Sequence, residues 1–327
     1  MNYRQLGKTD LNVSELSFGT WAIGGSWGKT NDGESLRALD FAMNQGVNFF
    51  DTADVYGDGH SEELLAKATK GKHDKIHIAT KFGRADDFTD PKNYTMESVA
   101  KYCEDSLRRL GREQIDLYQI HCPATEILKD GSVFEVLDRL KEQGKIRYYG
   151  VSVETVEEGL ICLQNPNVSS LQVIFNLFRQ KPLEELFPKA KQQGVGILAR
   201  VPLASGLLTG KFRMDAEFEE DDHRNFNRNG DAFNVGETFA GLEFNKGVEL
   251  ANKLSGISEN RGNMTQAALK WILEHDAISS VIPGFKTVAQ AEDNLKAIYA
   301  SPYTPEEMEK LGQFYKEQVA SEIRGAY

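Results

Sequence analysis

Four side chains that could share one reaction stand at or just after the ends of short apolar segments: Asp51, Tyr56, Lys81 and His121. A phenol has a pKa of about 10 and is a poor acid at neutral pH, but an ammonium group about 4 Å away contributes roughly 4 kcal/mol at an effective dielectric constant of about 20. We therefore expect Lys81 to lower the pKa of Tyr56 toward neutrality, and Asp51 to keep a buried Lys81 charged. With His121 hydrogen-bonding a substrate oxygen, the set suits proton transfer to or from a carbonyl or alcohol oxygen.

Such chemistry requires a cofactor that moves a hydride, which points to a nicotinamide dinucleotide. The sequence lacks a glycine-rich dinucleotide fingerprint after an early strand, so a Rossmann domain is not expected. The segment GLLTGKF, residues 206–212, is one residue too short for a nucleoside triphosphate loop and ends in Phe212, but its glycine-rich backbone can bind a pyrophosphate. His73 and His77 have a ligand-like spacing, but they fall at a strand that turns their rings apart, and we predict no metal site.

The order of the secondary-structure elements predicts the frame that positions these residues. Short apolar segments alternate with amphipathic ones such as SVAKYCEDSLRRLG, in which apolar side chains recur at helical spacing until Gly111 ends the pattern. Eight repeats of strand and helix indicate an α/β fold, a closed (β/α)8 TIM barrel whose catalytic groups lie at the carboxyl ends of the strands. A hairpin around residues 7–10 is expected to close the other end. The expected strands span residues 16–19, 48–51, 76–81, 115–121, 148–152, 171–175, 196–200 and 279–283.

The connections between these elements bear on domain organisation. No linker rich in proline or serine interrupts the alternation, so we predict a single domain over residues 1–327. Extra helices and loops are expected at the catalytic mouth. The longest irregular segment, residues 212–238, is a candidate lid over a ligand, and its acidic cluster lacks the pattern of a calcium loop.

Composition narrows the class of partner. A formal net charge of −11 and a pI near 5.2 argue against nucleic acid or an anionic membrane surface as partners. Three cysteines are too few for a disulfide framework, the amino terminus lacks the apolar core of a signal peptide, and no run of about eighteen apolar residues occurs. We expect a cytoplasmic protein that acts on a small molecule and is a monomer or a weak homo-oligomer.

Eight sequence segments together resemble one known family. They are, in chain order, FGTWAIGG, FFDTADVYGDGHSEELLAKA, IATKFG, LYQIH, LKEQGKIRYYGVS, QVIFNLF, PLASGLLTGKF and VIPGFKTVAQAEDNLKA. From about Tyr3 to Ala300 the sequence resembles the aldo-keto reductases, in the branch that includes bacterial reductases and potassium-channel β subunits. The resemblance implies a (β/α)8 barrel that holds an extended NAD(P)H across its mouth.

The same resemblance implies roles for individual residues. Tyr56 would be the proton donor, Lys81 and Asp51 would tune it, and His121 would orient the carbonyl. The expected substrate pocket is mainly aromatic and is formed by Trp21, Trp27, Tyr56, Phe82 and His121. The expected cofactor contacts are Gly19, Thr20, Trp21, Asp51, Ser152, Gln172, Arg200, Leu203, Ser205, Gly206, Leu207, Lys211, Gly284, Lys286, Gln290, Asp293 and Asn294.

Two positions depart from the family pattern. Val153 stands where many members have an Asn after the serine of GVS, so one hydrogen bond to the nicotinamide carboxamide is lost or is supplied by another group. Arg200 stands where many members have a Tyr. Its planar guanidinium can stack on the nicotinamide, but its charge disfavours the cationic oxidised ring. We therefore expect Arg200 to favour carbonyl reduction.

The main functional expectation is an NADPH-dependent oxidoreductase that reduces an aldehyde or ketone to the alcohol. Two alternatives stay open: an NAD(P)-dependent dehydrogenase of a sugar or polyol, and a regulatory subunit that senses the cofactor. We expect NADP(H) to be preferred and NAD(H) to be the alternative cofactor, because Lys286 is the only cation in IPGFKTVAQAEDN that could bind the 2′-phosphate.

Overall fold

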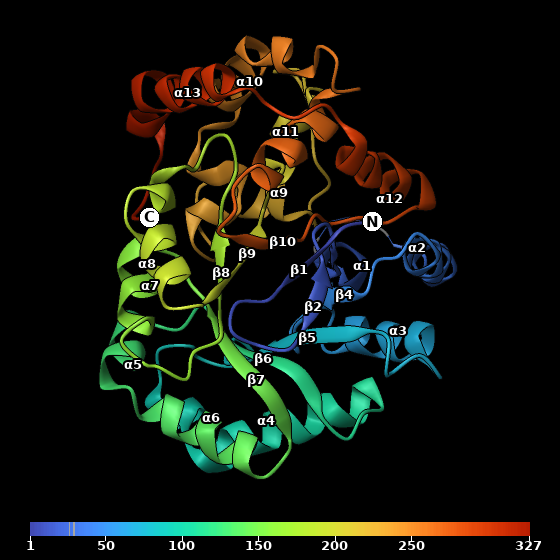
Figure 1. Ribbon diagram of the computed structural model, residues 1–327, viewed down its shortest axis with the longest axis vertical. Helices are drawn as coiled ribbons and strands as arrows, with labels where there is room; N and C mark the ends of the chain where they lie inside the picture. Colours follow the sequence, from blue (N-terminus) through green and yellow to red (C-terminus); the bar gives the residue numbers. More distant parts are fainter. Residues whose placement is uncertain (26, 29) are drawn as a thin grey trace.

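In the computed structural model, which describes residues 1–25, 27–28 and 30–327, eight parallel strands form a ring with helices around it (Figure 1). Each barrel strand pairs with the next one along the chain. Bridges from Leu16 to Val281 and from Gly19 to Gly284 join the two ends of the sheet, so the expected closed barrel is confirmed. The strands are β3 (Phe18–Gly19), β4 (Phe49–Asp51), β5 (His77–Phe82), β6 (Ile115–His121), β7 (Ile146–Ser152), β8 (Ser170–Ile174), β9 (Gly196–Arg200) and β10 (Ile278–Val281).

Helices connect the strands on the outside of the barrel. The connecting helices are α2 (Asp32–Asn44), α3 (His60–Thr69), α4 (Met96–Leu110), α6 (Ser132–Glu142), α7 (Val156–Cys162), α8 (Leu186–Gln192), α11 (Met264–Leu273) and, after β10, α12 (Val288–Leu295). Additional helices are α1 (Trp21–Gly24), α5 (Thr125–Asp130), α9 (His223–Phe226), α10 (Phe244–Lys253) and α13 (Pro305–Phe314). Short helical turns are η1 (Pro91–Tyr94), η2 (Lys181–Leu183), η3 (Ala204–Thr209), η4 (Val235–Glu237), η5 (Phe239–Gly241), η6 (Ser255–Ser258), η7 (Lys296–Tyr299), η8 (Tyr315–Val319) and η9 (Ala320–Glu322).

Helix α4 shows how the sequence sets the bounds of these helices. The Thr95 side chain accepts a hydrogen bond from the backbone N–H of Ser98 and caps the first turn. Gly111 ends the helix with a φ of 62°, which glycine adopts without strain. Between them Val99, Cys103 and Leu107 lie one turn apart on the buried face, as the spacing predicts.

Side chains inside the barrel change from apolar to polar toward the carboxyl ends of the strands. An apolar cluster fills the lower interior and includes Phe49, Ala79 and Leu117. Successive residues of a strand point to opposite faces, so Asp51 and Lys81, two positions after Phe49 and Ala79, also point inward. The alternation therefore places polar groups directly above an apolar floor.

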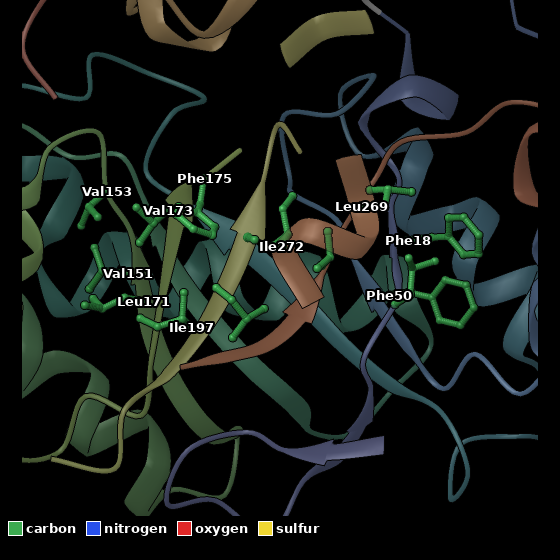
Figure 2. Packing of buried hydrophobic residues seen from close by; sticks show 14 of the residues in the cluster. Phe18, Phe50, Val151, Val153, Leu171, Val173, Phe175, Ile197, Leu269 and Ile272 are labelled. Atoms are coloured by element: carbon green, nitrogen blue, oxygen red, sulfur yellow. The ribbon is translucent and has the colours of Figure 1, made fainter. Parts of the chain in front are cut away.

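Outward-facing residues pack the barrel against its helices. Phe18, Phe50, Val151, Leu171 and Ile197 are buried in the larger apolar cluster. Figure 2 shows this layer of side chains, together with Leu269 and Ile272 from α11. This packing holds the strand ends, and thus the residues at the mouth, in fixed relative positions.

The amino-terminal hairpin covers the end of the barrel opposite the polar mouth, as expected. Strands β1 (Tyr3–Gln5) and β2 (Asn12–Ser14) are antiparallel. The backbone N–H of Lys8 donates to Gly194 O at 2.6 Å, just before the start of β9. Gly7 has a φ of 54°, and a Cβ there would lie 2.4 Å from the same carbonyl oxygen, so this close approach requires glycine.

The long segment at residues 212–238 is more ordered than the sequence suggested, because it includes α9 and η4. Asp222 caps α9 and Asn234 caps η4, each through its side-chain oxygen. No described helix is both long and apolar enough to cross a membrane.

Candidate active site

Asp51, Tyr56 and Lys81 form a chain of contacts at the carboxyl-terminal mouth. Lys81 Nζ lies 2.6 Å from Asp51 Oδ2, 2.8 Å from the carbonyl oxygen of Thr52 and 3.3 Å from Tyr56 Oη. Lys81 is fully buried. The ring of His121 stands edge-on to that of Tyr56, with centroids 5.8 Å apart. The structure therefore brings together the four residues that the sequence predicts to be catalytic.

Two glutamines fix the other oxygen of Asp51. Gln172 Nε2 donates to Asp51 Oδ1 at 2.7 Å, and Gln119 Nε2 donates to the same atom at 3.2 Å. Sequence reasoning missed Gln119, although it precedes His121 by two residues on β6 and therefore shares its face. Gln172 was expected to bind the carboxamide of the cofactor, but its amide nitrogen is engaged by Asp51.

The pKa of Tyr56 is raised, whereas the sequence argument expected it to be lowered. Burial raises the pKa of the phenol, the Lys81 ammonium lowers it and the Asp51 carboxylate raises it again, for a net value of about 12. The sequence argument counted the attraction to Lys81 but not the larger cost of removing a phenolate from water. Tyr56 is consequently protonated at neutral pH, which is the form that can give a proton.

His121 and Lys81 have fixed protonation states near neutral pH. Burial, followed by the charges of Lys81, Arg84 and Arg200, holds the pKa of His121 well below its usual value, so the imidazole is neutral. Burial also lowers the pKa of Lys81, but Asp51 and Tyr56 outweigh it and the net shift is upward. A charged ammonium and a neutral imidazole thus flank the phenol of Tyr56.

A cavity of about 770 Å³ opens above these groups and runs along the mouth to the loop after β10. Every residue expected to contact the cofactor lines it except Thr20 and Leu207. Thr20 is fully buried and its hydroxyl donates to the Asp51 carbonyl oxygen at 2.9 Å. Leu207 is buried in the larger apolar cluster. These two residues hold the wall of the cavity and do not form its surface.

Among the residues expected to bind substrate, Phe82 is misplaced. Its side chain is fully buried and its ring lies 4.7 Å from the ring of Tyr118, in the layer between barrel and helices. The physical reason is alternation, since Lys81 points into the barrel and the next residue must point out. Trp21, Trp27, Tyr56 and His121 do line the cavity. The Trp21 and Tyr56 rings stack at 6.0 Å, so the predicted aromatic wall is present.

Arg200 lines the cavity, as expected, but Glu237 balances its charge. This corrects the expectation that its charge favours carbonyl reduction. Its guanidinium forms a buried ion pair with Glu237 of η4 and donates to Val153 O at 2.9 Å. A paired guanidinium exerts a weaker field on a neighbouring ring than a lone one. The argument that Arg200 alone biases the protein toward carbonyl reduction therefore fails.

Several cavity residues were not foreseen because they lie in the connections that follow the barrel strands. Arg84 and Phe88 follow β5, while Arg224, Phe233 and Glu237 come from the long segment after η3. Arg84 lies three residues past Lys81. The rule that strand ends supply polar groups could have identified it as a candidate site residue. Nothing in the sequence indicates that Glu237 reaches across to Arg200.

Three potential metal ligands meet beside the cavity: Cys122, Glu154 and Glu237. Two guanidinium groups share this space, since Arg200 pairs with Glu237 and Arg84 lies 3.5 Å from Glu154. The positive charges of these two guanidinium groups oppose the binding of a further cation. The geometry gives no support for a metal ion at this cluster.

The cavity suits a dinucleotide better than a small substrate alone. Its volume lies in the range of sites that hold large ligands. One end carries Ser152, Gln172 and the buried Nδ1 of His121, which has no hydrogen-bond partner among the described residues. The other end carries Lys286 and Asn294. Between them, Val201, Ala204 and Ser205 have positive φ values, a strained backbone of the kind found where a ligand is held.

A closed parallel barrel with a polar cavity at the carboxyl ends of its strands has the architecture of a TIM-barrel enzyme. More particularly, the chain belongs to the aldo/keto reductase family, whose family model matches residues 15–316. The chain is thus an NAD(P)H-dependent oxidoreductase, as its fold, its cavity and its relatives agree.

The relatives extend over nearly the whole chain. An uncharacterized oxidoreductase of Bacillus subtilis (strain 168), YqkF, is 33% identical over 330 residues and is matched over 98% of each protein. A probable voltage-gated potassium channel subunit beta of Arabidopsis thaliana is 28% identical over 331 residues, 96% of each protein. The structure of the glycerol dehydrogenase AKR11B4 from Gluconobacter oxydans is similar with a TM-score of 0.77 at 30% identity, over 100% of this chain and 98% of that one.

Proposed function

We propose that the protein reduces an aldehyde or ketone to the alcohol, with NADPH as the preferred cofactor and Tyr56 as the proton donor. The observation that carries this proposal is the contact chain from Asp51 through Lys81 to a protonated Tyr56, beside a neutral His121. The cofactor, when bound, supplies the hydride that the carbonyl carbon receives.

The residues at the mouth supply the proton and hold the carbonyl. The neutral imidazole of His121 has one N–H that donates to the carbonyl oxygen and orients it. As that oxygen gains charge, Tyr56 gives it the phenolic proton, so that one hydride and one proton convert the C=O to CH–OH. The Lys81 ammonium, 3.3 Å from Tyr56 Oη, stabilises the phenolate that is left. Asp51 keeps this ammonium charged and in place.

Residues along the rest of the cavity would hold the dinucleotide. Ser152 and the carbonyl oxygen of Gln172 would contact the nicotinamide carboxamide, and Ser205, Gly206 and Lys211 would contact the pyrophosphate; all five residues line the cavity. The Ser205 hydroxyl already donates to Glu237 O at 3.1 Å, so this residue would act mainly through its backbone. At the far end, Gly284, Gln290, Asp293 and Asn294 would surround the adenosine.

A second candidate function is the reverse reaction, oxidation of a polyol. It is favoured by the relative from Gluconobacter oxydans named a glycerol dehydrogenase, which is 30% identical over almost the full length. The same groups serve both directions, because Tyr56 would then receive the alcohol proton. A deprotonated phenol is needed for that step, and the raised pKa of Tyr56 weighs against it near neutral pH.

The first prediction tests the proposed reaction directly. Purified protein should oxidise NADPH when an aldehyde or ketone is added, with one equivalent of alcohol formed for each NADPH consumed. Loss of NADPH absorbance over a panel of carbonyl compounds measures this, and a polyol panel with NADP⁺ at the same pH measures the reverse. A protein that binds NADPH but turns over no member of either panel would instead support the regulatory alternative.

The second prediction concerns cofactor choice. Lys286 lines the cavity, and its ammonium donates to the backbone carbonyl of Trp27. The neighbouring cation Arg224 is engaged by Asp222 through contacts of 2.9 and 2.6 Å. A charge-assisted contact between Lys286 and the 2′-phosphate is worth about 1.5–3 kcal/mol, so we expect NADPH to bind about 10- to 100-fold more tightly than NADH. The dissociation constants of both cofactors measure this preference.

The variant Lys286→Met should lose most of this preference. Lys211→Met is the matched control, because it removes the same charge from the same cavity at the expected pyrophosphate, which both cofactors share. It should weaken NADPH and NADH by similar factors. A Lys286→Met protein that keeps the parent's preference would place the 2′-phosphate elsewhere.

A further inference from the structure

Arg84 is a cation of the cavity wall whose hydrogen-bonding capacity is not used inside the protein. It lies in the loop after β5 and lines the same cavity as Tyr56 and His121. Its side chain is only 15% exposed. A guanidinium has five N–H donors, yet that of Arg84 makes no hydrogen bond to any residue that the structure describes. Its unused N–H donors belong to a partly buried group on the wall of a ligand cavity, where a bound molecule can accept them.

The other two cations that act on His121 are already bound within the protein. Lys81 donates to Asp51 and Thr52, and Arg200 is paired with Glu237 and donates to Val153. Arg84 differs from both of them because its side chain makes an ion pair but no hydrogen bond within the part of the chain that the structure describes. Its ion pair with Glu154 Oε1 is 3.5 Å long, too long for a good charge-assisted hydrogen bond.

Glu154 lies beside Arg84 but does not use its hydrogen-bond donors. Its Oε2 accepts from Asn234 Nδ2 at 2.8 Å, whereas its buried Oε1 has no hydrogen bond among the described residues. Burial, then the nearby Glu237, raises the pKa of Glu154. The remaining carboxylate on this side, Asp86, accepts a hydrogen bond from the Tyr102 hydroxyl at 3.0 Å. The Phe88 ring, 5.3 Å from Arg84 Cζ, helps to hold the guanidinium.

We infer that Arg84 is the anion-binding residue of the substrate pocket, and that the preferred carbonyl substrate carries a carboxylate. This inference rests on the proposed reduction of a carbonyl group. The planar fork of a guanidinium matches the two oxygens of a carboxylate, and such bidentate pairs are strong in a partly buried site. A hydroxyl group accepts from only one of the two arms, so a neutral polyol uses this residue less well. Arg84 would thus set which carbonyl compounds are reduced.

Matched pairs of an acid and its methyl ester test this third prediction. We choose 4-carboxybenzaldehyde with methyl 4-formylbenzoate, and 4-oxobutanoate with methyl 4-oxobutanoate, since the members of each pair differ in the negative charge and in one methyl group. The parent protein should reduce the acid of at least one pair with a kcat/KM about 10- to 100-fold higher than its ester. Arg84→Met should bring this ratio close to one, chiefly through KM, because the contact binds ground state and transition state alike.

Two further variants separate the charge from the geometry. Arg84→Lys keeps a positive charge without the fork, so its ratio of acid to ester should fall between those of the parent and Arg84→Met. Arg37→Met on α2 is the control for net charge, since the Arg37 side chain is 66% exposed and lies outside the cavity. It should keep the parent's ratio. Thermal unfolding and NADPH affinity verify that each variant is folded.

Equal kcat/KM values for acid and ester in the parent, or an unchanged ratio in Arg84→Met, would overturn the inference while leaving the proposed function intact. If no aldehyde is reduced, the proposed function fails. A binding measurement then tests separately whether Arg84 binds an anion. Calorimetric titration of the NADP⁺-saturated protein with benzoate and with benzamide measures the anion site without turnover. Benzoate binding that is lost in Arg84→Met supports the site, and the absence of any preference for benzoate overturns it.

Discussion

Replacing Tyr56 with Phe should lower the turnover number for carbonyl reduction by a factor of about 10² or more, because a positioned proton donor contributes at least that much. The change removes one oxygen atom that lines a cavity, so the fold and the NADPH affinity should stay close to those of the parent. Stopped-flow or steady-state loss of NADPH absorbance measures turnover, and titration of the protein fluorescence measures affinity.

Tyr94→Phe is the matched control for this fourth prediction. The Tyr94 hydroxyl is buried outside the cavity and donates to the Phe88 carbonyl oxygen at 2.8 Å. Its loss should cost about 0.5–1.5 kcal/mol of stability and have little effect on turnover. If Tyr56→Phe turned over at the parent's rate, another group would have to supply the proton, and the raised pKa of Tyr56 would be only a consequence of burial.

The strand ends were predictable from the sequence because two simple rules govern them. Parallel strands bring their carboxyl ends together, and alternation decides which residues point inward. These rules place Asp51, Lys81 and His121 at one mouth without any knowledge of the loops. Applied consistently, they would also have included Gln119 and excluded Phe82. Both errors arose from judging a residue by its type and not by its position in the strand.

The protonation state of Tyr56 could not be predicted in the same way. Its pKa depends on how far the phenol is removed from water, and the sequence does not give the depth of burial. The ion pair of Arg200 with Glu237 was out of reach for a related reason. These two residues are 37 positions apart and meet only because the segment after η3 folds back over the mouth. Long-range contacts between loops have no periodic pattern in the sequence.

The segment predicted to be a lid lies between these two cases, because the sequence predicted only part of what the structure shows for it. The length of the segment at residues 212–238 correctly indicated that it lies at the mouth, since Arg224, Phe233 and Glu237 line the cavity. The short helices α9 and η4 within it were not foreseen. Each depends on a cap by a single polar side chain, Asp222 or Asn234, and one such residue does not by itself predict a helical turn. Chain length thus predicted the location of the segment but not its conformation.

The largest effect on stability should come from Asp51→Asn. Lys81 is fully buried, and Asp51 Oδ2 is its carboxylate partner at 2.6 Å. Removal of one member of a buried ion pair leaves an uncompensated charge and typically costs about 3–5 kcal/mol. We expect Asp51→Asn to lower the free energy of unfolding by about this amount at neutral pH, as measured by denaturant titration. Turnover should fall by a factor of about 10² or more, because Lys81 loses the carboxylate that keeps it charged beside Tyr56.

The double variant Asp51→Asn/Lys81→Met separates the structural from the chemical role of this pair. It replaces both charges with neutral groups of similar volume, so it should recover much of the lost stability without recovering turnover. In Asp51→Asn itself, burial is left to depress the pKa of Lys81 below its value in the unfolded chain. The native state then binds fewer protons than the unfolded one, and the stability of the single variant should rise with pH up to the usual pKa of lysine, about 10.4. A single variant as stable as the parent, or a double variant less stable than the single one, would mean that Asp51 and Lys81 do not act as a buried ion pair.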